Sequence, residues 1–170
     1  MKKTFTLLFI AASLLTITSC KKTEVCETGY TGSNCNTQIT PSRILITNIQ
    51  INSFPPTASN GSGWDLTDGA DIFPEFLNSS QQVIKSFSSN RISNASPYAS
   101  YYFTPTPSIE ITNVTGQYIL ALYDWDGVSA NDFMRGISFY PYSSTNGFPK
   151  TVTYNVGTGF SFTLSYSYVF

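Results

Sequence analysis

The chain has 170 residues, of which 11% are charged and 15% aromatic, and its formal net charge is −1. A charge this close to zero excludes the basic footprint of a nucleic-acid-binding protein, and the 11 Gly and 9 Pro favour short strands joined by turns over helices. The sequence contains no histidine, which excludes a histidine triad, base or metal ligand. Any bound metal would therefore be held by oxygen atoms.

The first twenty residues have the pattern of a cleaved export signal. Lys2 and Lys3 form a positive start, an apolar stretch covers 5–15, and Ser19 precedes Cys20. The stretch is shorter than the roughly 20 apolar residues of a membrane-spanning helix. It resembles a bacterial lipoprotein signal, in which a small residue precedes the cysteine that becomes the acylated N-terminus. A plain secretory signal with a chance cysteine is the alternative.

The lipoprotein resemblance implies that 1–19 is removed and that 20–25 is a lipid-anchored N-terminus attached through Cys20. Two or more acyl chains hold a protein firmly on a bilayer, whereas one chain binds only marginally. We therefore expect a membrane-anchored protein of the bacterial cell envelope. The expected location is the outer membrane, on its periplasmic or its surface face.

The three cysteines of the chain are accounted for if Cys20 is acylated. Cys26 and Cys35 then remain as an even pair in an oxidising compartment. Residues 26–35 read C-E-T-G-Y-T-G-S-N-C, which resembles the last hairpin of an EGF-like module, without the other four cysteines of a full module. We expect a disulfide hairpin at 26–35 that acts as a rigid spacer, followed by a linker at 36–42.

Short runs rich in β-forming residues occupy the rest of the chain. In 44–51, Ile44 and Ile46 alternate with Ile49 and Ile51, so that the two pairs face opposite sides of a strand. Further runs are separated by turn clusters, at 71–77, 83–88, 98–103, 109–112, 117–125, 133–140, 151–156 and 160–170. No stretch keeps a helical period, so the pattern predicts an all-β sandwich or barrel.

All the aspartates of the chain lie in two predicted loops, at 63–71 and 124–132. They are Asp65, Asp68, Asp71, Asp124, Asp126 and Asp132. Clustered carboxylates repel one another by about 1 kcal/mol per close pair in water and about 4 kcal/mol at an effective dielectric of 20. Calcium removes that repulsion, because it takes six to eight oxygen ligands. An EF-hand fits poorly, since its twelfth position would be an arginine and its flanks are strands.

Residues 123–136 resemble the third calcium-binding loop of C2 domains of the synaptotagmin and protein kinase C type. That loop reads D-[FW]-D-x-x-S-x-x-D-[FI]-x-G, and here one extra residue precedes the glycine. Asp65 and Asp71 match the aspartates of the family's first loop, and 96–98 resembles the element before its fourth strand. The resemblance implies an eight-stranded antiparallel Greek-key β-sandwich over 43–170. It implies the circularly permuted type II topology, because the tail at 159–166 resembles the first strand of the other type.

The resemblance also implies a set of calcium ligands for two ions, with three as an alternative. The ligands would be the carboxylates of Asp65, Asp71, Asp124, Asp126 and Asp132, the carbonyl of Trp125 and, for an outer ion, Ser129 and the carbonyl of Ala130. Leu66 and Val128 are the loop tips that would contact a membrane. Asp68 is extra to the pattern and is expected in solvent or beside the ligands.

Three interpretations of such a site follow. Calcium would promote docking to a glycan or protein partner, promote docking to phospholipid, or only stiffen the loops. Phospholipid is the less favoured partner, because Gly127 stands where the family often has a basic residue and only Lys85 and Arg91 are near the family's polybasic strand. We expect no enzyme, since no nucleophile elbow, P-loop or glycine-rich cofactor motif occurs. Trp64 and Trp125 are expected to pack the bases of the loops.

Overall fold

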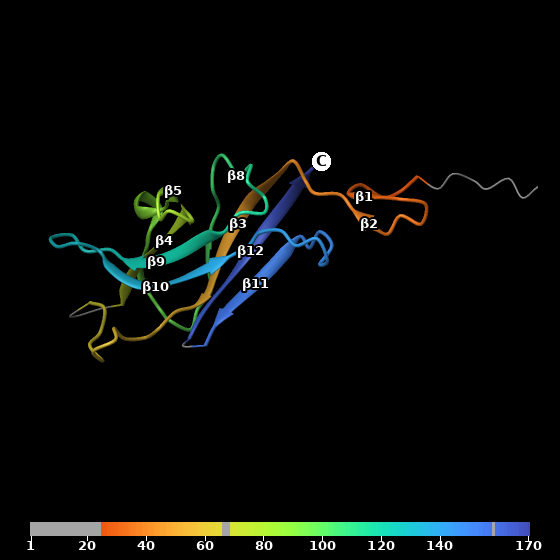
Figure 1. Ribbon diagram of the computed structural model, residues 1–170. Helices are drawn as coiled ribbons and strands as arrows, with labels where there is room; N and C mark the ends of the chain where they lie inside the picture. The colour runs from red at the N-terminus through yellow and green to blue at the C-terminus, as the bar shows by residue number, and fades with distance from the viewer. Residues whose placement is uncertain (1–24, 66–68, 158) are drawn as a thin grey trace, which may run out of the picture.

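The protein is described by a computed structural model over residues 25–65, 69–157 and 159–170. Two five-stranded antiparallel sheets form a sandwich, and a two-stranded hairpin precedes it (Figure 1). One continuous apolar core lies between the sheets, with buried side chains from both. In the described part of the chain, no helix is long and apolar enough to cross a membrane. The predicted all-β sandwich is confirmed.

Each sheet has four strand positions, and in each the outer position is divided between two short strands. One sheet has the order β11-β12-β3, with β7 and β8 both pairing with β3, and the other has the order β10-β9-β4, with β5 and β6 both pairing with β4. The first sheet consists of β3 (Arg43–Ser53), β7 (Tyr101–Phe103), β8 (Ile109–Ile111), β11 (Thr151–Val156) and β12 (Phe160–Val169). The second consists of β4 (Ala70–Asn78), β5 (Val83–Ser86), β6 (Ile92–Ala95), β9 (Tyr118–Asp124) and β10 (Asp132–Phe139).

The last strand of the chain lies beside the first strand of the sandwich. β12 pairs with β3 in an antiparallel register that runs from Ser161↔Ser53 to Val169↔Arg43. The tail at 159–166 was expected to take this position in the permuted arrangement. β3 leads directly into the first aspartate loop, so the type II order of strands agrees with the sequence prediction.

Pro74 explains why β5 and β6 are separate strands. Proline has no N–H to donate to a neighbouring strand. The Pro74 carbonyl accepts from Phe87 N–H at 3.1 Å, so the missing N–H of Pro74 faces the same side of β4. A short 3-10 turn, η1 (Ser88–Asn90), lies at this point, and β5 and β6 pair with β4 on either side of it. β6 was not among the runs predicted from the sequence.

A bulge in β3 corrects the predicted faces of this strand. Ile44, Ile46, Ile49 and Ile51 are all fully buried, although strict alternation places the first pair opposite the second. In the pairing with β12, Ile46 is opposite Tyr166 and Asn48 is opposite Ser165, so Thr47 has no partner. The extra residue shifts the alternation by one and turns all four isoleucines into the core.

The disulfide hairpin packs against the sandwich. Its strands are β1 (Tyr30–Thr31) and β2 (Thr37–Gln38), and the Cys26–Cys35 disulfide closes it. Thr37 and Gln38 therefore form a strand within the segment expected to be a linker, because they pair with β1. The hairpin lies at the end of the sandwich that holds the C-terminus, away from the β9–β10 loop (Figure 1). We call these the hairpin end and the loop end.

Side chains fix the hairpin to the segment between β10 and β11. Gln38 Nε2 donates to the Ser143 carbonyl at 2.9 Å, and Gly147 N–H donates to Gln38 Oε1 at 3.0 Å. The rings of Tyr30 and Phe148 meet edge to face, with centroids 5.3 Å apart. Gly29 has φ +94°, and a side chain there would collide with Phe148. These contacts fix the hairpin to the sandwich, and its role as a rigid spacer stays a prediction.

Candidate calcium site

One backbone and one side-chain hydrogen bond bring the two aspartate loops together at the loop end. Trp125 N–H donates to the Asp71 carbonyl at 2.9 Å, and Asp71 N–H donates to Asp124 Oδ1 at 2.6 Å. These contacts continue the β4–β9 pairing, in which Ile72 is opposite Asp124. The end of β9 and the start of β4 are therefore neighbours. Residues 53 positions apart in the sequence meet in the fold, as a shared site requires.

Asp124 is the centre of this arrangement. It is fully buried and is the one buried charged or polar residue recorded in the described part of the chain. Among the described residues, its Oδ2 atom has no hydrogen-bond partner. The pKa of the Asp124 carboxyl is raised to about 6, mainly by burial and also by the negative charges of Asp65, Asp126 and Asp71, while the hydrogen bond from Asp71 N–H lowers it. A buried carboxylate with three negative neighbours and a free oxygen has the chemistry of a cation ligand.

Asp71 is held by residues of β6. Its Oδ1 atom accepts from Asn94 N–H at 3.0 Å, and its Oδ2 atom accepts from Ser93 Oγ at 3.1 Å. Arg91 Nε lies 3.6 Å from Oδ2, and the Arg91 guanidinium stacks 3.7 Å from the centroid of the Trp125 ring. These contacts could not be predicted from the sequence, because β6 shows neither a motif nor a clear alternation.

The other predicted ligands of the β9–β10 loop are more exposed. Asp126 is half-buried, and its N–H donates to Asn131 Oδ1 across the loop at 3.1 Å. Asp132 is opposite Asp124 in the pairing of β10 with β9, and its side chain is exposed. Ser129 is exposed as well. These positions leave the carboxylates of Asp126 and Asp132 accessible to an ion at the edge of the loop.

The two predicted loop tips are Leu66 and Val128. Val128 is completely exposed, and its contact with a membrane stays a prediction. Leu66 and Asp68 lie outside the described residues, so their predicted places are not tested. Asp65 is half-buried at the near edge of that segment and adds to the negative charge around Asp124.

The carboxylates are near one another but do not form a finished coordination shell. Within 25–65, 69–157 and 159–170, no three Asp, Glu or Cys residues converge into a group that could hold a metal ion. Asp71 is held by its contacts with β6, and Asp132 is exposed to solvent, so neither carboxylate is directed toward a common centre with the others. Calcium would have to draw the oxygens closer, so the predicted metal site remains a prediction.

Two further predictions concern the residues that flank the aspartate loops. Trp64 Nε1 donates to the Pro55 carbonyl at 2.8 Å, and Trp64 and Trp125 both pack against the core, which confirms their expected packing. The extra residue of the loop motif coincides with a bulge. Phe133 is opposite Tyr123 and Arg135 is opposite Leu122, so Met134 is left over, and its side chain is buried.

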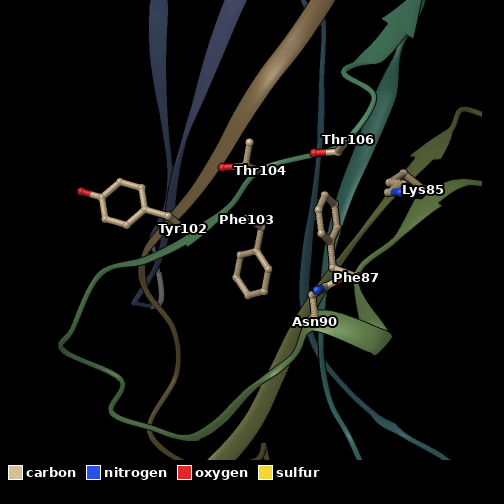
Figure 2. Close-up of a pocket in the computed structure, with 7 residues that line it drawn as sticks. All are labelled: Lys85, Phe87, Asn90, Tyr102, Phe103, Thr104 and Thr106. Atoms are coloured by element: carbon tan, nitrogen blue, oxygen red, sulfur yellow. The ribbon is translucent and has the colours of Figure 1, made fainter.

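A groove of about 470 Å³ lies on the side of the sandwich between β5 and β7. Its lining residues are Lys85, Phe87, Asn90, Tyr102, Phe103, Thr104 and Thr106 (Figure 2). Lys85 lies over the Phe87 ring, with Nζ 5.7 Å from the centroid, and is the single cation among these residues. Arg91, its expected companion, is instead engaged with Asp71. The described groove therefore has no polybasic character.

The fold has a counterpart among solved structures. A solved structure described as a C2 domain matches with a TM-score of 0.51 and 13% identity, over 75% of this chain and 98% of that chain. A C2 domain of a plant extended synaptotagmin 1 matches with a TM-score of 0.45 and 14% identity, over 76% of this chain and 96% of that chain.

Human GIVD cytosolic phospholipase A2, solved with an inhibitor and terbium chloride, matches with a TM-score of 0.42 and 15% identity, over 76% of this chain and 18% of that chain. No protein-family model and no curated protein matches the sequence. At these identities the likeness is one of fold. The match with a TM-score of 0.51 thus shows a C2-like fold, and calcium binding and a partner are matters of proposal.

Proposed function

We propose that this chain is a calcium-binding C2-like module, anchored through Cys20 to a membrane of the bacterial cell envelope, that docks to a partner when calcium is bound. The observation that carries the proposal is the fully buried Asp124, whose Oδ2 has no partner and whose neighbours are carboxylates from both loops. Burying such a charge is costly without a cation. Calcium would supply that cation and engage Asp65, Asp71, Asp126 and Asp132.

The partner we favour is a glycan or a protein. Phospholipid docking relies on cationic side chains that add to the charge of bound calcium, and the described groove beside β5 has Lys85 alone. The exposed tip of the β9–β10 loop is Val128, which offers one small apolar side chain to a bilayer. Calcium that only stiffens the loops is the alternative, and it predicts binding of the metal without a partner.

Calcium binding is tested by thermal unfolding of the whole chain in detergent, with and without calcium. An extracellular module should bind calcium at about 0.1–1 mM. At 10 mM calcium the stabilisation is then roughly 1–3 kcal/mol, which corresponds to a rise in Tm of roughly 2–10 °C.

The Asp124→Ala/Asp126→Ala variant should lose this rise. Glu110→Gln is the matched control, because Glu110 is an exposed carboxylate paired with Arg43 at the opposite end of β3. A rise that persists in the double variant would place the calcium elsewhere.

Docking is tested separately by pull-down on liposomes and on immobilised glycans, each with calcium and with a chelator. Recovery on glycans that requires calcium supports the proposed partner, and recovery on liposomes replaces it with phospholipid. Equal recovery in calcium and chelator, in a protein whose Tm rises with calcium, leaves the stiffening role.

A further inference from the structure

Arg91 is a cation that joins the two candidate calcium loops. Its Nε lies 3.6 Å from Asp71 Oδ2 in the first loop, and its guanidinium lies 3.7 Å from the Trp125 ring centroid in the second. Two-thirds of the Arg91 side chain is removed from solvent, with 34% left exposed. Contacts with a carboxylate and an aromatic face are the two interactions for which a planar guanidinium is suited.

The position of Arg91 conflicts with a calcium ion on Asp71. Ser93 and Asn94 already occupy both carboxylate oxygens of Asp71, and Arg91 adds its charge at Oδ2. A divalent cation at these oxygens would stand within a few ångströms of the guanidinium, where like charges repel strongly. Calcium binding at Asp71 therefore requires the guanidinium to move or the ion to bind more weakly.

The contact is also suited to release. Arg91 Nε is beyond hydrogen-bond distance from Asp71 and has no hydrogen-bond partner within the described part of the chain. This atom therefore contributes charge but no hydrogen bond, and the guanidinium stacks on Trp125. In the calcium-free protein the guanidinium still offsets the negative charge of Asp71. That negative charge is one of the causes that raise the pKa of Asp124.

We propose that Arg91 is a built-in counter-cation, which neutralises the calcium-free site through Asp71 and lowers the affinity of the site for calcium. The competition part rests on the proposed calcium function. The neutralising part concerns the calcium-free protein and can be tested on its own. Arg91 does not bind the metal itself; it acts through the carboxylate of Asp71, as a positioning residue does.

The neutralising role is tested by a double-mutant cycle of Arg91→Gln and Asp71→Asn in chelator, with Tm as the readout. Arg91→Gln alone should lower Tm by roughly 3 °C, and in the Asp71→Asn background it should lower Tm by clearly less. Equal losses in both backgrounds would overturn this role, because the two side chains would then act independently.

The competition is tested by titrating the original chain and its arginine variants with calcium. Tryptophan fluorescence and calorimetry are the readouts. Arg91→Gln should bind calcium about tenfold more tightly than the original chain at low ionic strength, with a smaller difference at about 1 M salt. Arg91→Lys keeps the charge and should stay near the original affinity. Arg43→Gln controls for net charge and should leave calcium affinity unchanged, because Arg43 begins β3 at the hairpin end.

Two outcomes would overturn the competition. One is an unchanged or weaker calcium affinity in Arg91→Gln, and the other is equal behaviour of Arg91→Gln and Arg91→Lys. If neither the original chain nor Arg91→Gln binds calcium, the proposed function and the competition fail together, while the double-mutant cycle still decides the neutralising role.

Discussion

At the scale of single residues, Asp124 combines two roles that oppose each other. Its Oδ1 atom fastens β9 to β4 by accepting from Asp71 N–H, which contributes to the fold. Its Oδ2 atom is buried without a partner near three carboxylates, which costs stability when no cation is present. A residue that costs stability in the isolated chain and sits between two loops is characteristic of a binding site.

Asp124→Asn should therefore raise the stability of the calcium-free protein at pH 7. Because burial raises the folded pKa from 3.8 to about 6, the stability lent by the protonated form is full below about pH 4 and is lost by about pH 6. The neutral amide avoids this loss, with an expected gain of about 1–3 kcal/mol by urea unfolding in chelator. The exposed Asp132→Asn is the control and should gain little. A destabilised Asp124→Asn would show that the charge is already compensated.

At the scale of elements, the pairing of β11 with β12 buries a cluster of tyrosines. The hydroxyls of Tyr154 and Tyr166 are 3.0 Å apart, and the ring of Tyr168 lies 6.1 Å from that of Tyr166. Burial is the main cause that raises the pKa of each, for Tyr168 to about 12. The cluster fastens the last strand of the sandwich with groups that resist ionisation.

This cluster should make stability fall in alkaline solution. The unfolded chain releases tyrosine protons near pH 10, whereas the folded chain keeps them, so the free energy of unfolding declines between about pH 10 and 12. Tyr166→Phe should reduce that slope in urea unfolding at pH 9, 10.5 and 11.5. Tyr98→Phe is the control, because Tyr98 is 84% exposed. A slope unchanged in Tyr166→Phe would mean that Tyr166 ionises in the folded protein as it does when unfolded.

At the scale of the whole molecule, the hairpin and the aspartate loops lie at opposite ends (Figure 1). β3 has 11 residues and joins the two ends, which is roughly 35 Å of strand. The five residues from Cys20 to the described chain reach at most about 18 Å. An anchored protein could not place its hairpin end high enough above its own bilayer for the loops to point straight down. If Cys20 anchors the chain and calcium promotes docking, as proposed, we expect the loops to engage partners away from the anchoring membrane.

This orientation is checked with lipidated protein on vesicles that carry a glycan found to bind in the pull-down, mixed with separate vesicles that carry the same glycan. Calcium should cross-link the two populations, measured by turbidity, and Cys20→Ser, which removes the lipid attachment, should abolish cross-linking. Inserting about 20 Gly/Ser residues after Lys22 should weaken it, because the loops can then reach their own bilayer. Cross-linking that is absent in the short-tether protein but present in the long one would contradict the expected orientation.

Local patterns in the sequence were enough to predict the class of fold and the two loops. Alternating runs predict strands wherever one face is buried, and aspartates confined to two turns indicate a common site, because clustered carboxylates repel one another unless a cation lies among them. The pairing of Cys26 with Cys35 was predicted because acylation of Cys20 leaves these two cysteines as an even pair, and the disulfide is present.

Tertiary structure decided what depends on partners distant in the chain. The bulge at Thr47 exists only in the pairing of β3 with β12, and it sends Ile49 and Ile51 to the core. The place of Arg91 depends on β6 lying beside β4 and on the β9–β10 loop reaching back to both. A pattern along one segment records which of its faces is buried. Which charges meet across segments is settled only when the strands pair.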